Sequence, residues 1–140
     1  MNSDIFGNLR EWGQVLELLE SLKKSEKLDE HQSGLARILR YGENWRLLEA
    51  VLEYGKEINQ PTDEFLQEVN NIMNDQNIYL DARMLAVNTL VCLFPRINRK
   101  NNHKFSQTLV VRKMRDILNS PEPPIFHEAV KKSLNSIMGK

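Results

Sequence analysis

Seven segments of the chain repeat apolar side chains with the spacing of an α-helix, and this pattern limits the fold more than any other feature. In the first segment the apolar residues recur three or four positions apart, at Leu9, Trp12, Leu16 and Leu19. Because an α-helix turns once in about 3.6 residues, these side chains fall on one face. No segment alternates apolar and polar residues as a half-buried strand does. We therefore predict an all-α fold of about seven helices.

Residues that favour helix ends separate the segments. Asp29, followed three residues later by Gln32, forms a capping-box pattern, which predicts that Asp29 caps the second helix. Gly42 is predicted to end that helix. Gly55 falls inside the third segment, where close approach of a neighbouring helix would explain a glycine. Further boundaries are predicted at Lys24, Asn44, Pro61–Thr62, Pro95 and Pro121–Pro124.

The segment from Leu80 to Phe94 leaves almost no polar face. A helix that is apolar nearly all round is covered by neighbours on several sides, so we predict a central position for it. Its Cys92 is the only cysteine of the chain and is predicted to be buried as a small apolar side chain. A single cysteine also excludes an internal disulfide framework.

Short connections between the helices favour antiparallel hairpins. Stacked hairpins would form an α-α superhelix, and an irregular helical bundle is the alternative. At 140 residues the chain fits one domain, which we predict to span residues 1–140. No apolar run approaches the roughly 20 residues of a membrane span. The start, Met1–Gly7, also lacks the features of a secretory signal, so we expect a cytoplasmic protein.

Two stretches resemble HEAT repeats. One has the turn Asn119–Pro123 followed by Phe126–Ile137, similar to the family's acidic-proline turn and its helix patterned V-R-x-A-A-x-x-A-L-x-x-L. The other has Asp75 followed by Ala82–Leu93, with Asp75 and Arg83 where the family usually has Asp and Arg. The residue about 44 positions after Arg83 is His127, which replaces the usual arginine. This spacing falls in the HEAT range.

The resemblance implies a HEAT-like superhelix that acts as a scaffold, with a concave face lined by one helix of each hairpin. Most members of that group bind proteins, some bind nucleic acid and a few are enzymes. Both stretches depart from the family pattern by one or two extra residues between turn and helix. The third helix, which begins at Asn44, is a weaker copy.

The net charge is zero, but charge is distributed unevenly along the chain. Residues 1–95 hold 9 Lys and Arg against 16 Asp and Glu, a net of −7. Residues 96–140 hold 10 against 3, a net of +7. Charge separated in this way indicates association with a charged partner.

Most of the positive charge lies in a predicted loop, residues 96–104, and on the helix that follows. At about 100° per residue, Arg112 and Arg115 share nearly one side of that helix. If the loop folds over that side, up to seven positive charges converge and suit phosphate, an acidic peptide or an acidic protein face. A solvated loop beside an ordinary polar helix face is the alternative. The predicted partner-binding residues are Arg96, Arg99, Lys100, Lys104, Arg112, Lys113 and Arg115.

An acidic protein is the favoured partner. The net charge of −7 on residues 1–95 repels a long polyanion, and the basic tract lacks aromatic residues on which bases stack. Nucleic acid is therefore the less favoured partner. The acidic half of a second copy is a further alternative, through head-to-tail association.

Two other groups of residues have both a structural and a functional interpretation. Trp12 and Trp45 are predicted to anchor helix packing, whereas an exposed indole would mark a binding hot spot. Glu49, Glu53 and Glu57 repeat every fourth residue, which favours an exposed surface over a docking face for a basic partner.

No motif indicates catalysis. His31, His103 and His127 are too scattered for a metal site, with His103 expected in the loop and His127 in the first turn of the last helix. Phosphate-binding loops and nucleophile elbows are also missing from the sequence. We expect no catalytic residue, no metal and no cofactor. The sequence predicts a non-catalytic protein-interaction scaffold; a nucleic-acid-binding HEAT-like module or a HEAT-like enzyme are the alternatives.

Overall fold

The computed structural model of the protein describes residues 4–139, in which every regular element is helical. The α-helices are α1 (Trp12–Lys24), α2 (Gln32–Tyr41), α3 (Trp45–Tyr54), α4 (Asp63–Asn74), α5 (Leu80–Leu93), α6 (Gln107–Leu118) and α7 (Pro124–Ile137). Short 3₁₀ turns cover Leu28–His31, Gly55–Glu57 and Phe94–Arg96. The all-α fold and its seven helices are confirmed for this part of the chain.

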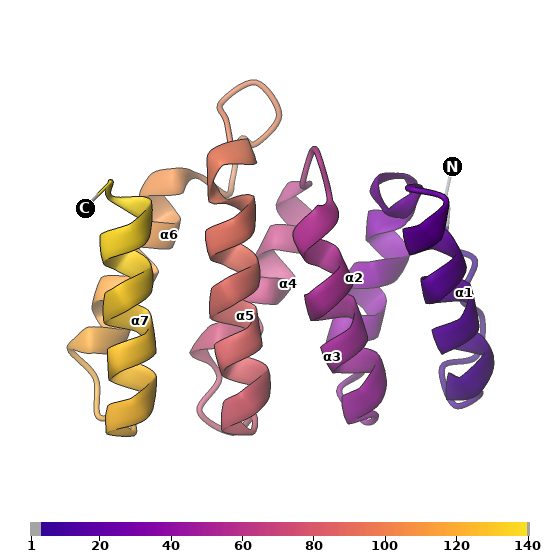
Figure 1. Cartoon of the computed structure of the whole chain (residues 1–140), viewed down its shortest axis with the longest axis horizontal. Coiled ribbons are helices and arrows are strands. Elements are labelled where there is room, and N and C mark those ends of the chain that lie inside the picture. The colour runs from indigo at the N-terminus through magenta and orange to yellow at the C-terminus, as the bar shows by residue number, and fades with distance from the viewer. Residues whose placement is uncertain (1–3, 140) are drawn as a thin grey trace.

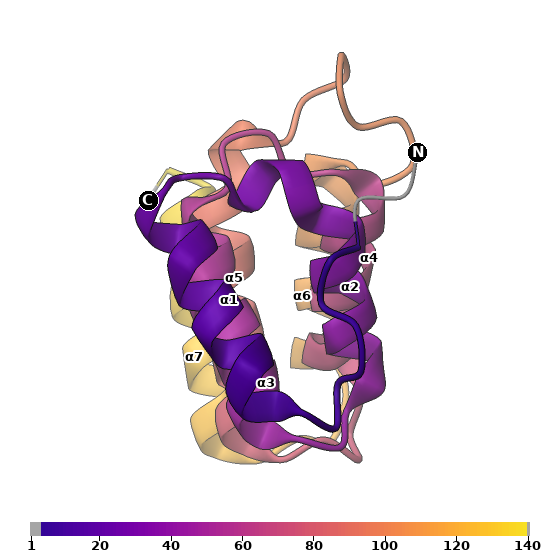
Figure 2. The same ribbon diagram turned by 90° about the vertical axis from the view of Figure 1, so that its right-hand side faces the viewer.

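The helices stack in two layers (Figures 1 and 2). One layer holds α1, α3, α5 and α7 side by side, and the other holds α2, α4 and α6. Successive helices run in opposite directions, so that all four helices of the first layer point the same way. This arrangement is the predicted stack of antiparallel hairpins.

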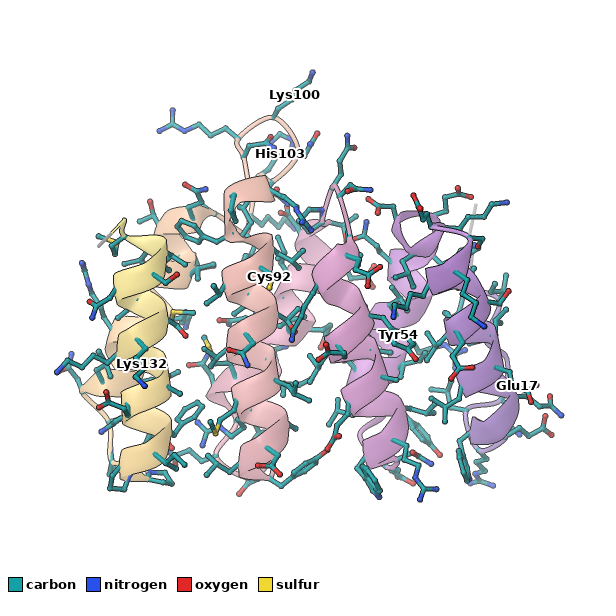
Figure 3. All side chains as sticks on the ribbon, in the orientation of Figure 1. Glu17, Tyr54, Cys92, Lys100, His103 and Lys132 are labelled. Atoms are coloured by element: carbon teal, nitrogen blue, oxygen red, sulfur yellow. The ribbon has the colours of Figure 1, made fainter. Side chains whose placement is uncertain are left out.

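A continuous cluster of buried apolar side chains fills the space between the layers. The inner helix α5 packs against α3, α4 and α7, which confirms the central position predicted from its apolar character. Cys92 of α5, however, is exposed and not buried (Figure 3). In a two-layer stack each helix keeps one uncovered side, and Asp81 and Asn88 are exposed on α5 as well.

Side chains at the helix ends explain most of the boundaries. Asn44 accepts hydrogen bonds from the backbone N–H groups of the first turn of α3, and Gly42 ends α2 with a φ of 68°. Both agree with the sequence predictions. Asp29 does not cap α2, because it lies within the 3₁₀ turn Leu28–His31 and α2 begins only at Gln32.

Arg83 makes a buried ion pair between hairpins. Its Nη1 and Nη2 each donate to Glu122 at 2.8 Å, and both side chains are only 4% exposed. Its Nε donates to the carbonyl of Met73 at 3.0 Å, and its guanidinium lies 4.3 Å from the centre of the Phe126 ring. Arg83 therefore joins the end of α4 to the turn between α6 and α7. Asp75 accepts a hydrogen bond from the backbone N–H of Asn77.

Gly55 directly follows α3 and is buried. A Cβ at this position would lie 2.7 Å from Cζ of Phe65 on α4, which confirms the predicted close approach of a neighbouring helix. We expect Gly55→Ala to lower the free energy of unfolding by about 1–3 kcal/mol, because the Phe65 ring must move. Urea denaturation measures this change.

Gly13→Ala is the matched control, because a Cβ at this exposed position of α1 meets nothing within 4 Å. We expect this variant to equal or exceed the wild type in stability, since alanine favours a helix. Equal stability of the wild type and Gly55→Ala would contradict the close approach.

Candidate interaction surfaces

The loop of residues 97–106 rises beyond the ends of the helices (Figures 1 and 2). Its last part is held by the carboxylate of Asp63, the first residue of α4. The four donors to this carboxylate are the backbone N–H groups of His103 at 3.1 Å, Lys104 at 2.9 Å and Phe105 at 3.3 Å, and the side-chain amide of Asn102 at 3.0 Å. The loop therefore stands on a fixed base.

The charge of Asp63 is stabilised by these contacts. Burial alone raises the pKa of the carboxyl group, but the hydrogen bonds from Lys104, Asn102, Phe105 and His103 outweigh it, and the pKa lies below its usual value. Asn102 is itself buried and also donates to the carbonyl of Pro61 at 2.9 Å.

Asp29 holds the connection between α3 and α4 in a similar way. Its carboxylate accepts the backbone N–H groups of Asn59 at 2.9 Å and Gln60 at 2.8 Å. The buried Gln32 adds bonds to the carbonyl of Gln60 and from the N–H of Thr62. Asp29, just before α2, thus holds the connection after α3. Asp63, at the start of α4, holds the loop after α5.

The predicted basic residues have two different environments. Arg96 donates through Nη1 to the carbonyls of Lys56 at 2.8 Å and Ile58 at 2.6 Å, so its guanidinium belongs to the framework that supports the loop. Arg99, Lys100 and Lys104 are exposed in the loop. Figure 3 shows Lys100 at the tip of the loop, pointing away from the helices.

The remaining three predicted residues lie on α6. Arg112 and Arg115 are exposed and Lys113 is half-buried. The loop extends away from the helix ends and does not fold back along α6 (Figure 2). The seven cations therefore form a loop group and an α6 group in place of the single convergent patch considered in the sequence analysis. A hollow of about 180 Å³, lined in part by Arg99 and Thr108, lies where the loop meets α6.

Ion pairs are confined to other parts of the molecule. In residues 4–139, none of the ion pairs involves a cation of residues 97–115. Acidic residues, in contrast, are often engaged. Their partners include Arg37 for Asp4, Lys23 for Glu57, Arg40 for Glu64 and Glu68, and Lys56 for Glu53. Glu49 accepts a hydrogen bond from the Tyr79 hydroxyl at 2.7 Å, so each of the three regularly spaced glutamates of α3 and the 3₁₀ turn after it has an internal partner.

Both tryptophans are exposed, so the packing role predicted for them is wrong. Trp12 is 38% and Trp45 is 56% exposed, and each is the first residue of its helix. The guanidinium of Arg46 lies 5.1 Å from the centre of each indole ring. The three side chains form a cluster at the edge of the first layer.

His127 lies in the first turn of α7, as predicted, and has a structural contact there. Its Nε2 lies 2.9 Å from the carbonyl oxygen of Ile117 and 2.8 Å from that of Ser120. A protonated Nε2 therefore donates to the end of α6. His103 is exposed in the loop, also as predicted.

Comparisons with protein families, with curated proteins and with solved structures found no match for this chain. The resemblance to HEAT repeats therefore stays a prediction. Within residues 4–139, every helix is too short or too polar to cross a membrane.

We expect Asp63→Asn to loosen the loop, because a neutral amide accepts the three backbone N–H groups less strongly than a carboxylate. The free energy of unfolding should fall by about 1–3 kcal/mol. Hydrogen exchange of the amides of residues 103–105, followed by mass spectrometry, should become faster. Asp81→Asn, at an exposed position of α5, is the control and should leave this exchange unchanged. Unchanged exchange in Asp63→Asn would show that the carboxylate does not hold the loop.

Acid should destabilise the protein through three carboxylates whose pKa is lowered in the fold. The pKa of Asp4 is lowered mainly by Arg37, that of Glu122 mainly by Arg83, and that of Asp63 by the loop amides against burial. Because the unfolded chain binds protons first, their contribution is complete above about pH 5 and is lost as the pH falls through about 4 and below. Urea denaturation from pH 2 to 7 measures this loss, and Asp63→Asn should make the acid slope shallower. An identical slope in both proteins would contradict the assignment of Asp63.

Proposed function

We propose that the chain is a non-catalytic scaffold that binds an acidic surface of a protein partner through its basic C-terminal half. One observation carries the proposal: the exposed cations Arg99, Lys100, Lys104, Arg112 and Arg115 enter no ion pair within the described part of the chain. Exposed like charges without a partner favour attraction of an opposite charge from outside. Lys113 belongs to the same set but is half-buried, and Arg96 supports the loop from below.

The stack supplies a rigid mount for these charges. The loop base is fixed by Asp63 and the buried Asn102, and α6 is packed through Val110, Met114 and Ile117. A fixed arrangement favours binding because few side chains must be ordered when the partner arrives. A cytoplasmic location belongs to the same proposal.

Nucleic acid is a less favoured ligand of this surface. The exposed cations cluster around the loop and α6, whereas a binder of long nucleic acid needs them along a whole face. Head-to-tail association remains an alternative source of acidic surface. In Figure 3, Glu17 points outward from α1 at one end of the stack, while Lys132 lies on α7 at the other end.

Charge reversal tests the proposal. We expect Arg112→Glu/Arg115→Glu to bind an oligoglutamate peptide about tenfold more weakly than the wild type, because each exposed ion pair contributes up to about 1 kcal/mol. Fluorescence anisotropy of a labelled peptide measures the affinity, and affinity capture from native lysate should lose the partner. Lys131→Glu/Lys132→Glu, with the same change of charge on exposed residues of α7, is the matched control. Identical peptide affinities and identical captured proteins for the two double variants would remove Arg112 and Arg115 from the proposal.

A further inference from the structure

Four large apolar side chains are exposed at the starts of the four helices of the first layer. They are Trp12, Trp45, Tyr79 and Ile125, exposed by 38%, 56%, 41% and 59%, and we call them the apolar rim. Each stands at the start of a different helix: Trp12 begins α1, Trp45 begins α3, Tyr79 precedes α5 and Ile125 is the second residue of α7. Since these four helices start at the same end of the layer, the rim presents one apolar residue per helix (Figure 1).

Three contacts hold the aromatic members of the rim in place. Arg46 lies 5.1 Å from the centres of both indole rings, between Trp12 and Trp45. The hydroxyl of Tyr79 donates to Glu49 at 2.7 Å. Side chains that are ordered before binding lose little conformational entropy when a ligand covers them. Exposed, ordered aromatic side chains are the residues that contribute most at binding hot spots.

The rim is too small for a stable dimer of this chain. At roughly 200 Å² for a large side chain, exposures of 38–59% leave about 400 Å² on one molecule. Two rims facing each other would bury about 800 Å², whereas stable interfaces bury about 1,200–2,000 Å². A narrow ligand that follows the rim fits this area better than a second copy.

The spacing of the rim selects the shape of that ligand. Packed helices lie roughly 8–10 Å apart, which sets the spacing of the helix starts that carry the rim residues. A polyproline II helix presents the same face every third residue, which is a repeat of about 9.3 Å. One residue of such a segment therefore meets each helix of the layer in turn. We propose that the apolar rim binds an extended, proline-rich segment of a partner protein.

Hydrogen bonding supports the same ligand. The starts of α1, α5 and α7 have no side-chain cap, which leaves backbone N–H groups of their first turns without side-chain acceptors. Proline has a carbonyl acceptor and no N–H donor. A proline-rich segment can accept from these groups without burying a donor of its own.

Charge complementarity defines the flanks of the segment. Glu11, Glu43 and Asp81 are exposed beside the rim and form no ion pair within residues 4–139. Their carboxylates favour Lys or Arg next to the prolines. They repel the phosphates of a single-stranded nucleic acid, whose bases would otherwise stack on the indoles.

The rim lies where the helices of the first layer begin, and the loop of residues 97–106 rises beyond the ends at which they finish (Figure 1). The inference rests on the proposed function only in taking the ligand to be a protein segment. Loss of oligoglutamate binding in Arg112→Glu/Arg115→Glu and loss of proline-peptide binding in rim variants are separate measurements, so one proposal can fail while the other stands.

The probe is dodecaproline with two arginines at each end, titrated into the full chain. Trp12 and Trp45 are the only two tryptophans of the sequence, so a saturable change of tryptophan emission reports directly on the rim. The twelve prolines span about 37 Å and reach all four helices, whereas tetraproline spans about 12 Å and reaches two. With the same flanks, tetraproline and a twelve-residue Gly-Ser peptide should each bind at least about tenfold more weakly than dodecaproline.

Variants locate the binding on the rim, with anisotropy of a labelled peptide as the readout. Trp45→Ala and, separately, Ile125→Ser should each weaken dodecaproline binding about tenfold, since hot-spot truncations have effects of this size. Arg46→Ala should also weaken it, although both indoles remain. Met138→Ala, which is 48% exposed just beyond the opposite end of α7, should bind like the wild type. Ile125→Ser leaves the contacts between Arg46 and the two indole rings intact, so it serves as the test if Trp45→Ala does not fold.

Four results would overturn the inference. They are equal binding of the Gly-Ser peptide, unchanged binding in both Trp45→Ala and Ile125→Ser, tighter binding of an oligothymidylate strand than of dodecaproline, and a dimer of the free chain that Trp45→Ala dissociates.

Discussion

The buried ion pair between Arg83 and Glu122 joins the last hairpin of the stack to the hairpin before it. An isolated charge in such a place would be strongly destabilising. Here the guanidinium is engaged by the Glu122 carboxylate, the Met73 carbonyl and the Phe126 ring. Asp63 and Asp29 make comparable contacts at the opposite ends of the helices. There each carboxylate accepts hydrogen bonds from backbone N–H groups of a connection further along the chain. Apolar contacts hold the layers together, and these polar contacts set how each hairpin sits on the next.

Much of the fold follows from short-range patterns in the sequence. Helices were predictable because their apolar residues recur within a single turn, and the central place of α5 followed from its lack of a polar face. Polar contacts between hairpins were not, because Asp63 and Lys104 lie about 40 residues apart and no local pattern connects them. Asp29 illustrates the difficulty: beside Gln32 it resembles a local cap, but its acceptor oxygens serve the backbone of residues 59 and 60.

The candidate surfaces were harder to predict than the fold. Periodicity places Trp12 and Trp45 on the apolar side of their helices, but it does not reveal that both side chains stay exposed at the first position of each helix. Cys92 was misplaced for a related reason, since an apolar helix in two layers still has one uncovered side. For the basic residues the sequence predicted exposure, but only the structure separates Arg96, which is bound to two carbonyls, from the cations of the loop and α6.

Stacking in a row has a consequence for how the molecule opens. Within residues 4–139 each hairpin packs mainly on the hairpins beside it, so α7 gains its support from α5 and α6, and α1 gains most of its own from α3. Stability in such a chain of neighbours behaves like that of a zipper, which frays from either end while its middle stays closed. The outermost helices are therefore the first to exchange with unfolded conformations, and α4 and α5 are the last.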